Sequence, residues 1–456
     1  ETSASPSISK GDHPTLAQRY MALPVRWTGF LAVIVCAGLP SSMGGRDWMT
    51  AKTAQRPPVR QGSGMCLPRL PLRNRAGMRR ILTRRGLRAA ADTQALTERE
   101  FQLAPGIDRN AVAKDASRFR VFSYNVLADG PKYALSDYHG YSPIENRRWK
   151  SRYPRILKEI RHYDPDIVCL QEITRPMFQN SFYKDLQKAY TGLYAAKTDR
   201  KSKYQTSAMF VRTRRFKVIN GSLISFARMS EDYFRSLGAH EGSFNDLDLM
   251  ARMGAQDDKA LIALLEDRGT QQRMVAVSTH LYWNPKEPHV KVLQAYLLSK
   301  ALDEFIQRNN LDPEIPLVVA GDFNSLPNKT EPDIYDPVIP PAGLPSGAYA
   351  GLTTGCLDTK HPDHPKQRTM AECVGDLKFA FELTSAYAHV FGTEPLITTK
   401  TDKFSGTLDY IFVRNTKVAS ALGMPFDKDS VEGFGPIPNA VFPSDHIAIV
   451  SDLILP

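Results

Sequence analysis

The 456-residue sequence predicts a layered α/β domain over residues 106–456, preceded by a disordered basic leader over residues 1–105. Three observations lead to this prediction. Short apolar segments of strand length alternate with segments of helical spacing along most of the chain. A hydrophobic content of 42% is enough to bury the core of one large domain or two ordinary ones. No repeat period appears, which excludes a solenoid and favours sheets buried between helices.

The expected elements follow one another along the chain. The apolar patterns predict strands at Phe119 to Val126, Asp166 to Leu170, Ser207 to Val211, Met274 to Thr279, Leu317 to Ala320, Leu408 to Val413 and Ile447 to Leu453. The 3.6-residue spacing predicts helices over Arg148 to Tyr163 and Val290 to Ile306. Residues 228–257 and the proline-rich stretch 328–370 are expected to be insertions.

The formal net charge of +11 belongs almost entirely to the leader. Residues 1–100 contain 16 Lys and Arg against 6 Asp and Glu, so the other 356 residues have a net charge of only +1. Residues 48–91 contain eleven basic side chains and no acid. That composition does not bury enough surface to fold by itself, and it is typical of an organelle transit peptide.

A second targeting signal is expected at residues 21–42. Met21 is followed by Arg26, an apolar run from Phe30 to Leu39 and then small residues, which is the layout of a secretory signal. The two segments together predict a two-step leader for a plastid, and the Arg-rich part alone would serve a mitochondrion. The alternative is a disordered basic tail, with or without RNA binding.

Two further classes of protein are excluded by composition. The longest apolar run has ten residues, whereas a helix needs about 20 to cross a bilayer, so stable membrane insertion is not expected. The five cysteines are few and scattered and form no CxxC pair. The chain is therefore neither a disulfide scaffold nor a thiolate zinc protein.

Short polar side chains gather where the predicted strands meet loops, and strand ends at one sheet edge are the usual place for a site built from several strands. Carboxylates and amides are hard oxygen ligands that select Mg²⁺ or Mn²⁺ over zinc. Histidines beside them could donate to phosphate oxygens or move a proton. Such a set suits phosphodiester hydrolysis. The candidate residues are Asn125, Glu172, His280, Asn284, Asp322, Asn324, Asp409, Asp445 and His446.

Each of these residues has a structural explanation when it is taken alone. A single asparagine such as Asn125 or Asn324 more often caps a turn, and a single histidine is more often a satisfied structural residue. Six strand ends that all supply the same chemistry are improbable by chance, which favours the functional interpretation of the set.

The motifs YNVL, LQE, THLYWNP, GDFNS, LDYIF and SDH occur between Phe119 and Leu453 in an order that resembles the endonuclease/exonuclease/phosphatase superfamily. The THLYWNP motif, followed by a helix with Gln294, is similar to the deadenylase branch, which contains the catalytic subunit of the cytoplasmic deadenylase complex, nocturnin, angel and the mitochondrial 2′,5′-phosphodiesterase. One departure is the TSAMF strand: the family usually has a glycine shortly before this strand, whereas this chain has Thr206 and Ser207.

The resemblance implies a four-layer α/β sandwich with two central mixed sheets, and a Mg²⁺-dependent (or Mn²⁺-dependent) 3′→5′ exoribonuclease that acts on RNA, above all poly(A) 3′ ends. By the same resemblance, the metal would be held at Glu172 with Asn125 and Asp445. Asp322 and Asn324 would orient the attacking water and the phosphate, His280 would contact the phosphate, and Asp409 would orient His446. Asn284 would belong to the substrate-binding residues, and Pro285 and Phe404 would stack on the two faces of a 3′ adenine.

Other activities stay open at this point. A 2′,5′-oligoadenylate, nucleotide or lipid phosphodiesterase, an abasic-site DNA endonuclease, or a non-catalytic subunit of an organellar assembly would all fit the same fold. The sequence contains no leucine-rich repeats of the kind that recruit the cytoplasmic deadenylase to its complex. Because residues 101–456 are nearly neutral, RNA binding would depend on a locally basic groove, the metal and stacking.

Overall fold

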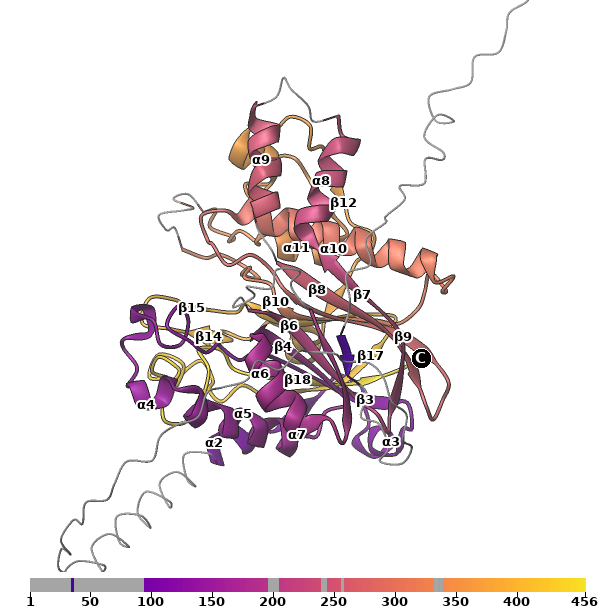
Figure 1. Ribbon diagram of the computed structural model, residues 1–456, viewed down its shortest axis with the longest axis vertical. Helices are drawn as coiled ribbons and strands as arrows, with labels where there is room; N and C mark the ends of the chain where they lie inside the picture. Colours follow the sequence, from indigo (N-terminus) through magenta and orange to yellow (C-terminus); the bar gives the residue numbers. More distant parts are fainter. Residues whose placement is uncertain are drawn as a thin grey trace, which may run out of the picture.

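The computed structural model describes residues 34–36, 94–195, 205–238, 244–255, 258–331, 336 and 339–456 (Figure 1). The predicted transit-like segment lies outside the described residues, as does the signal-like segment apart from strand β1 (Ile34–Cys36). Within the described ranges, no helix combines the length and the apolar character needed to cross a membrane.

Two mixed sheets form the centre of the domain. The first has the strand order β1-β5-β6-β4-β3-β18-β17-β2 and the second the order β13-β16-β10-β9-β8-β7. The first sheet contains β2 (Phe101–Leu103), β3 (Arg118–Asn125), β4 (Ile167–Ile173), β5 (Tyr190–Tyr194), β6 (Thr206–Arg212), β17 (Lys417–Leu422) and β18 (Ile449–Ile454). The second contains β7 (Phe216–Ser225), β8 (Lys259–Asp267), β9 (Arg273–His280), β10 (Leu317–Asp322), β13 (Thr384–Ser385) and β16 (Asp409–Arg414).

Two small antiparallel strand pairs and the helices complete the described structure. These pairs are the two-stranded sheet of β11 (Cys356–Leu357) with β12 (Leu377–Lys378) and the hairpin of β14 (Thr399–Lys400) with β15 (Ser405–Gly406). The helices are α2 (Gln94–Thr97), α3 (Arg109–Lys114), η2 (Asp137–His139), α4 (Ile144–Arg147), α5 (Trp149–Tyr163), α6 (Arg175–Met177), η3 (Phe178–Tyr183), α7 (Lys184–Leu186), α8 (Phe226–Ser236), α9 (Phe244–Ala255), α10 (Pro288–Arg308), α11 (Gly347–Thr354), α12 (Pro365–Thr369) and α13 (Ala386–Phe391).

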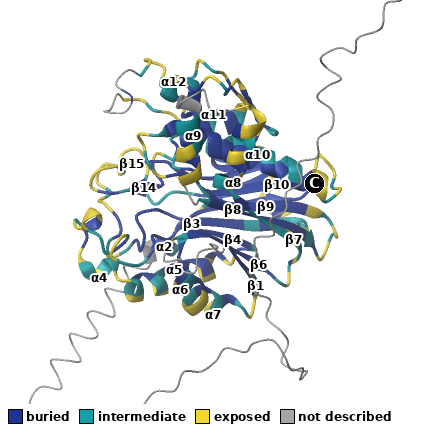
Figure 2. Cartoon of the chain, turned by 45° about the horizontal axis from the view of Figure 1, so that its top comes forward, coloured by how far each residue is buried: buried dark blue, intermediate teal, exposed yellow. Residues whose placement is uncertain are grey.

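The four layers follow from the alternation of side chains along the strands. In β3, Val121 packs between the sheets against residues such as Val318 of β10, whereas Phe122 faces outward and packs against Ile156 of α5. On the other side, Leu293 of α10 covers the second sheet. Both sheets are buried between the helical layers (Figure 2), so the predicted four-layer sandwich is confirmed.

The predicted insertions pack on the helical layer of the second sheet. Residues 228–257 supply most of the antiparallel pair α8 and α9, and the 328–370 region supplies α11 and α12. Helix α9 contacts both α8 and α12, and α10 contacts α8, α11 and α12 (Figures 1 and 2). The long α10 therefore joins the two insertions to the central sheets.

The described fold begins before residue 106, where the sequence placed its start. Strand β2 pairs with β17, with Ser420 opposite Leu103. The Tyr163 hydroxyl donates to the Leu96 carbonyl at 2.8 Å, and Arg99 pairs with the buried Glu159 at 3.6 Å. The sequence missed this boundary because β2 has only three residues and is stabilised by pairing with one strand, β17, more than 300 residues later.

We expect Glu159→Gln to change how stability depends on pH. Burial raises the pKa of Glu159 to about 7, although Arg99 opposes the shift. The folded state therefore binds the proton more tightly than the unfolded state, so stability should fall as pH rises from about 4.5 to about 7. Denaturation of wild type at pH 5 and pH 8 should show a loss on the order of 1–3 kcal/mol that Glu159→Gln removes. Equal pH profiles would contradict this role for Glu159.

Candidate active site

The strand pairing brings the predicted residues to one edge of the two sheets. In the second sheet, Asp322 lies opposite His280 in the parallel pair β9–β10 and opposite Asp409 in the antiparallel pair β10–β16. In the first sheet, β3 ends at Asn125 beside the end of β4, where Glu172 lies. The structure thus brings these strand ends together.

Backbone irregularities aim two of these strand ends. The register between β4 and β6 shifts between Leu170 and Ile173, and Glu172 has a left-handed φ of 60°. A bulge with this backbone re-aims a side chain at a functional edge, at a conformational cost of about 1–3 kcal/mol. At Gly321 a Cβ atom would lie 2.0 Å from the Thr279 carbonyl oxygen. Only glycine permits the close approach of β10 to β9 immediately before Asp322.

The carboxylate of Asp322 is the centre of the site. Its Oδ1 accepts from the Asn324 backbone N–H at 2.9 Å, which closes a turn and fixes the side chain. Its Oδ2 accepts from Asn125 Nδ2 at 2.9 Å. The same oxygen lies 3.5 Å from His280 Nε2 and 3.6 Å from His446 Nε2. One buried oxygen therefore faces groups from two other strands, β3 and β9, and from the loop before β18.

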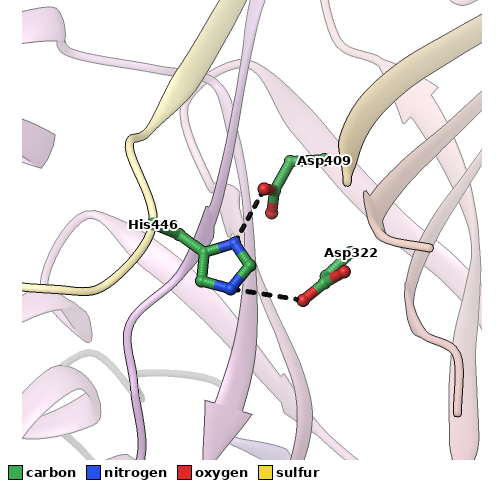
Figure 3. A group of neighbouring side chains, drawn as sticks. All are labelled: Asp322, Asp409 and His446. Atoms are coloured by element: carbon green, nitrogen blue, oxygen red, sulfur yellow. Dashed lines mark hydrogen bonds and ion pairs between the residues drawn. The ribbon is translucent and has the colours of Figure 1, made fainter. Parts of the chain in front are cut away.

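Asp409 and His446 form an orienting pair (Figure 3). His446 Nδ1 lies 2.8 Å from Asp409 Oδ2, which also accepts from the Thr398 hydroxyl at 2.6 Å. This contact places the other ring nitrogen of His446 toward Asp322. Burial disfavours charge on the imidazole, but Asp409 and Asp322 outweigh it and raise the pKa of His446 well above its ordinary value. A charged His446 at neutral pH is suited to stabilise negative charge on a phosphate.

Asn324 and His280 form the opposite side of the cluster. The Asn324 amide lies 3.0 Å from His280 Nε2 and donates to the Leu281 carbonyl at 2.9 Å. Asn324 also has a left-handed φ of 49°, a conformation that asparagine tolerates better than most residues. The side chain is thus held in place beside the imidazole.

Asp445 has a neighbour that the sequence analysis missed. Its Oδ2 lies 3.1 Å from His139 Nε2, and its Oδ1 accepts from the Ser444 hydroxyl at 3.3 Å. Burial disfavours the ionised carboxyl, but the His139 contact and the charge on His446 lower the pKa of Asp445 to about 2. His139 lies in η2, within a loop that has no periodic pattern, so only the three-dimensional contact could reveal it.

Arg152 was also missed, and it holds the loops around the site. This α5 residue is fully buried, and its guanidinium donates to the carbonyls of Val126 and Leu127 at 2.7 and 2.8 Å and to that of Pro443 at 3.2 Å. It thereby connects the loop after Asn125 to the loop before Asp445. Burial lowers its pKa to about 10, which leaves it charged at neutral pH.

The residues present suit a divalent cation. Glu172 is only partly buried, and its Oε1 and Oε2 accept from Asn125 Nδ2 at 3.3 Å and from the Ala128 N–H at 2.9 Å. Asn125 therefore bridges Glu172 and Asp322. Asp322, Asp409 and His446 also bring potential ligand atoms within 4.8 Å of one another. His446 Nδ1 is occupied by Asp409, so that group functions better as an orienting pair, and the oxygen donors around Glu172 suit the cation better.

The predicted nucleotide-binding residues lie on two surface segments beside the site. Pro285 is exposed in the loop after β9, and Phe404 is 39% exposed between β14 and β15. Asn284 closes a turn, because its Oδ1 accepts from the Lys286 N–H at 3.0 Å. Gln294 of α10 accepts from the Tyr282 N–H at 2.7 Å and donates to Asp258 at 3.0 Å. The residue that marked the deadenylase resemblance thus fixes the Tyr282–Pro285 loop.

The departure at residues 206–207 is accommodated inside the first sheet. Thr206 and Ser207 begin β6 and are buried, and their hydroxyl oxygens have no hydrogen-bond partner among the described residues. Thr206 lies opposite Ile173, next to the bulge that carries Glu172. The two residues therefore border the site without entering its hydrogen-bond network.

A family model described as the endonuclease/exonuclease/phosphatase family matches residues 122–446. Among curated proteins, the chain is similar to the "CCR4-Not complex 3′-5′-exoribonuclease subunit Ccr4" of Mycosarcoma maydis, with 29% identity over 76% of this chain and 52% of the relative. The protein of the same name in Yarrowia lipolytica is 30% identical over 73% of this chain and 47% of the relative. The chain thus spans about half the length of these relatives.

Solved structures show the same fold. ANGEL2, described as a 2′,3′-cyclic phosphatase, aligns with a TM-score of 0.59 and 21% identity over 78% of this chain and 99% of that structure. The human nocturnin catalytic domain aligns with a TM-score of 0.50 and 22% identity over 78% of this chain and 97% of that structure.

Proposed function

The chain belongs to the endonuclease/exonuclease/phosphatase family, and we propose that it is a divalent-metal-dependent 3′→5′ exoribonuclease. The observation that carries the proposal is the convergence of Asn125, His280 and His446 on one oxygen of Asp322. The Ccr4 relatives are named as 3′-5′-exoribonucleases, which supports RNA as the substrate.

The residues have separate tasks in this reaction. A cation held by Glu172, with Asn125 and Asp445 nearby, would supply positive charge to the scissile phosphate. Asp322 accepts a hydrogen bond from the attacking water and takes its proton. His446, oriented by Asp409, donates to a phosphate oxygen as charge develops. His280 and Asn324 hold the phosphate on the other side. We propose Mg²⁺ as the natural cation and Mn²⁺ as a substitute, because the donors are hard oxygen atoms.

One comparison of substrates tests the proposal. Purified protein with Mg²⁺ or Mn²⁺ should shorten 3′,5′-oligo(A) from its 3′ end, and excess EDTA should stop the reaction. The same preparation is tested on 2′,5′-oligoadenylate and on abasic DNA. Cleavage of abasic DNA alone would overturn the proposal, and the absence of any metal-dependent hydrolysis would favour a non-catalytic subunit.

We also propose a preference for adenine at the 3′ end, and Phe404→Ala should weaken it. Phe404 is exposed in the turn after β14, whose Thr399 forms a β-bridge with His446. Loss of one stacking contact costs about 1–3 kcal/mol. The measurement is the ratio of kcat/KM on oligo(A) to that on oligo(U). Leu396→Ala, which removes another exposed apolar side chain (46%), is the control. An unchanged ratio in Phe404→Ala would contradict the stacking role.

We propose, finally, that residues 1–93 direct the protein to a plastid or a mitochondrion. Support comes from the eleven basic and no acidic side chains of residues 48–91. A fluorescent fusion that begins at Met21 should enter the organelle, and one that begins at Gln94 should not. Equal distribution of both fusions would contradict a targeting role.

A further inference from the structure

A polar cavity is lined in part by the loop that follows β9, the strand that ends at His280 of the candidate active site. It has a volume of about 440 Å³, and its walls include Arg252, Lys286, Arg368, His289, Asn284 and Glu287. The loop after β9 joins it to the site, because His280 at the start of that loop faces Asp322 and Asn284 further along lines the cavity. The other walls come from α9 and α12, which belong to the two insertions and contact each other (Figure 2).

The lining is cationic in an otherwise nearly neutral domain. Three basic side chains and one carboxylate, that of Glu287, line the cavity, and three further carboxylates pair with its arginines from outside the lining. Arg252 is held by Asp248 at 2.8 Å and by Glu287. Arg368 is held by Asp363 at 3.1 Å and by Asp336. Arg252 uses its Nε and Nη1 groups for these carboxylates. An arginine has five N–H donors, so the rest of this guanidinium can donate to another oxyanion.

Two further features favour an anion. The cavity lies at the N-terminal end of α10, a helix of 21 residues whose N-cap residue, Glu287, makes no side-chain capping bond. Helix N-termini of this kind attract phosphate groups. His289 in the first turn of α10 is only 4% exposed, and neither of its ring nitrogens has a hydrogen-bond partner among the described residues. A buried polar group without a partner is costly unless a ligand supplies one.

We propose that this cavity, defined by Arg252, Lys286, His289 and Arg368, binds a phosphate of the RNA chain other than the one that is cleaved. The proposal rests on the proposed exoribonuclease function and adds a second contact to the substrate. It supplies the locally basic groove that a domain with almost no net charge needs for RNA binding. A backbone phosphate carries no base information, so the cavity contributes affinity and positioning.

The test is binding of labelled five-residue RNA in EDTA, where no hydrolysis occurs. The double variant Arg252→Gln with Lys286→Gln should bind A5 roughly tenfold more weakly than wild type. The slope of log affinity against log salt should decrease by about 0.7, the value for one lost phosphate contact on a single strand. The affinity ratio of A5 to the dinucleotide ApA should also fall, since ApA has only the scissile phosphate. Unchanged A5 affinity or an unchanged salt slope would overturn the proposal.

A matched control separates this site from a general charge effect. Arg235 lies on the neighbouring helix α8 and pairs with Glu231 four residues earlier, as Arg252 pairs with Asp248. Arg235→Gln should leave A5 binding unchanged, and an equal loss in this variant would refute a specific site. The double variant should weaken A5 and U5 by the same factor, whereas a loss confined to A5 would indicate base recognition and overturn the phosphate assignment.

His289→Phe tests the buried imidazole separately. Removal of polar atoms without partners should leave the melting temperature unchanged or raise it. A5 binding should nevertheless weaken by several-fold, and unchanged binding would exclude the imidazole from the site. Because these measurements use EDTA, wild-type protein that binds A5 but hydrolyses no RNA with Mg²⁺ would refute the proposed function and leave the binding site intact.

Discussion

Asp322→Asn should reduce kcat on oligo(A) by roughly 10²–10⁴-fold, as expected for the loss of a group that accepts a proton in the transition state. The substitution keeps the size of the side chain, and its remaining oxygen can still close the turn with the Asn324 N–H. The other oxygen, which faces Asn125, His280 and His446, becomes a hydrogen-bond donor. A donor at that position repels the Asn125 amide and takes no proton from water.

Asp312→Asn is the matched control for this prediction. Asp312 precedes the same strand, β10, and its Oδ1 accepts from the Glu314 N–H at 2.8 Å, which is the same local turn that Asp322 makes with Asn324. It lies at the exposed start of the strand, away from the cluster. Both variants should fold, as judged by circular dichroism, and only Asp322→Asn should lose activity. A near-wild-type rate for Asp322→Asn would refute its assigned role.

Most of the site could be predicted from the sequence because polar residues at the ends of neighbouring strands meet at one edge of a sheet. His280 and Asp322 each end an apolar segment of strand length and Asp409 begins one, and register alone then places them side by side. His139 and Arg152 could not be found in this way. His139 lies in an irregular loop. Arg152 lies on the buried side of helix α5, whereas an arginine in a helix is normally expected to be exposed to solvent. Their roles depend on contacts with residues about 300 positions away.

The same reasoning explains which parts of the fold were missed. Helix α10 was predicted closely because its apolar face repeats over 21 residues. Strand β8 (Lys259–Asp267) contains the apolar run Ala260 to Leu265 and was not assigned, since a short apolar run does not distinguish a strand from a buried helix. Strand β2 has only three residues, and its place is decided by pairing with β17. Local pattern specifies long elements, whereas tertiary contacts specify the short ones.

Glu172→Ala and Glu172→Gly should both abolish metal-dependent hydrolysis. The glycine variant should be the more stable of the two, which is the reverse of the usual order in a strand. Both remove the carboxylate that we propose holds the cation, so both should also lose Mn²⁺ binding measured by calorimetry. Both lose the hydrogen bond from the Ala128 N–H. The remaining difference between them is the backbone, because residue 172 has a φ of 60°.

In a regular strand, glycine is less stable than alanine, because glycine loses more conformational entropy on folding. At a left-handed φ the order reverses, since a Cβ atom costs roughly 1–2 kcal/mol there. Chemical denaturation should therefore find Glu172→Gly more stable than Glu172→Ala by about 1 kcal/mol. If alanine were the more stable replacement, the left-handed backbone conformation of residue 172 would be contradicted. If either variant kept near-wild-type activity or Mn²⁺ affinity, the metal role of Glu172 would be refuted. Glycine at position 172 would thus give a more stable backbone than an acid. The proposed metal site requires a carboxylate there, so the strained backbone lowers stability at a position that serves function.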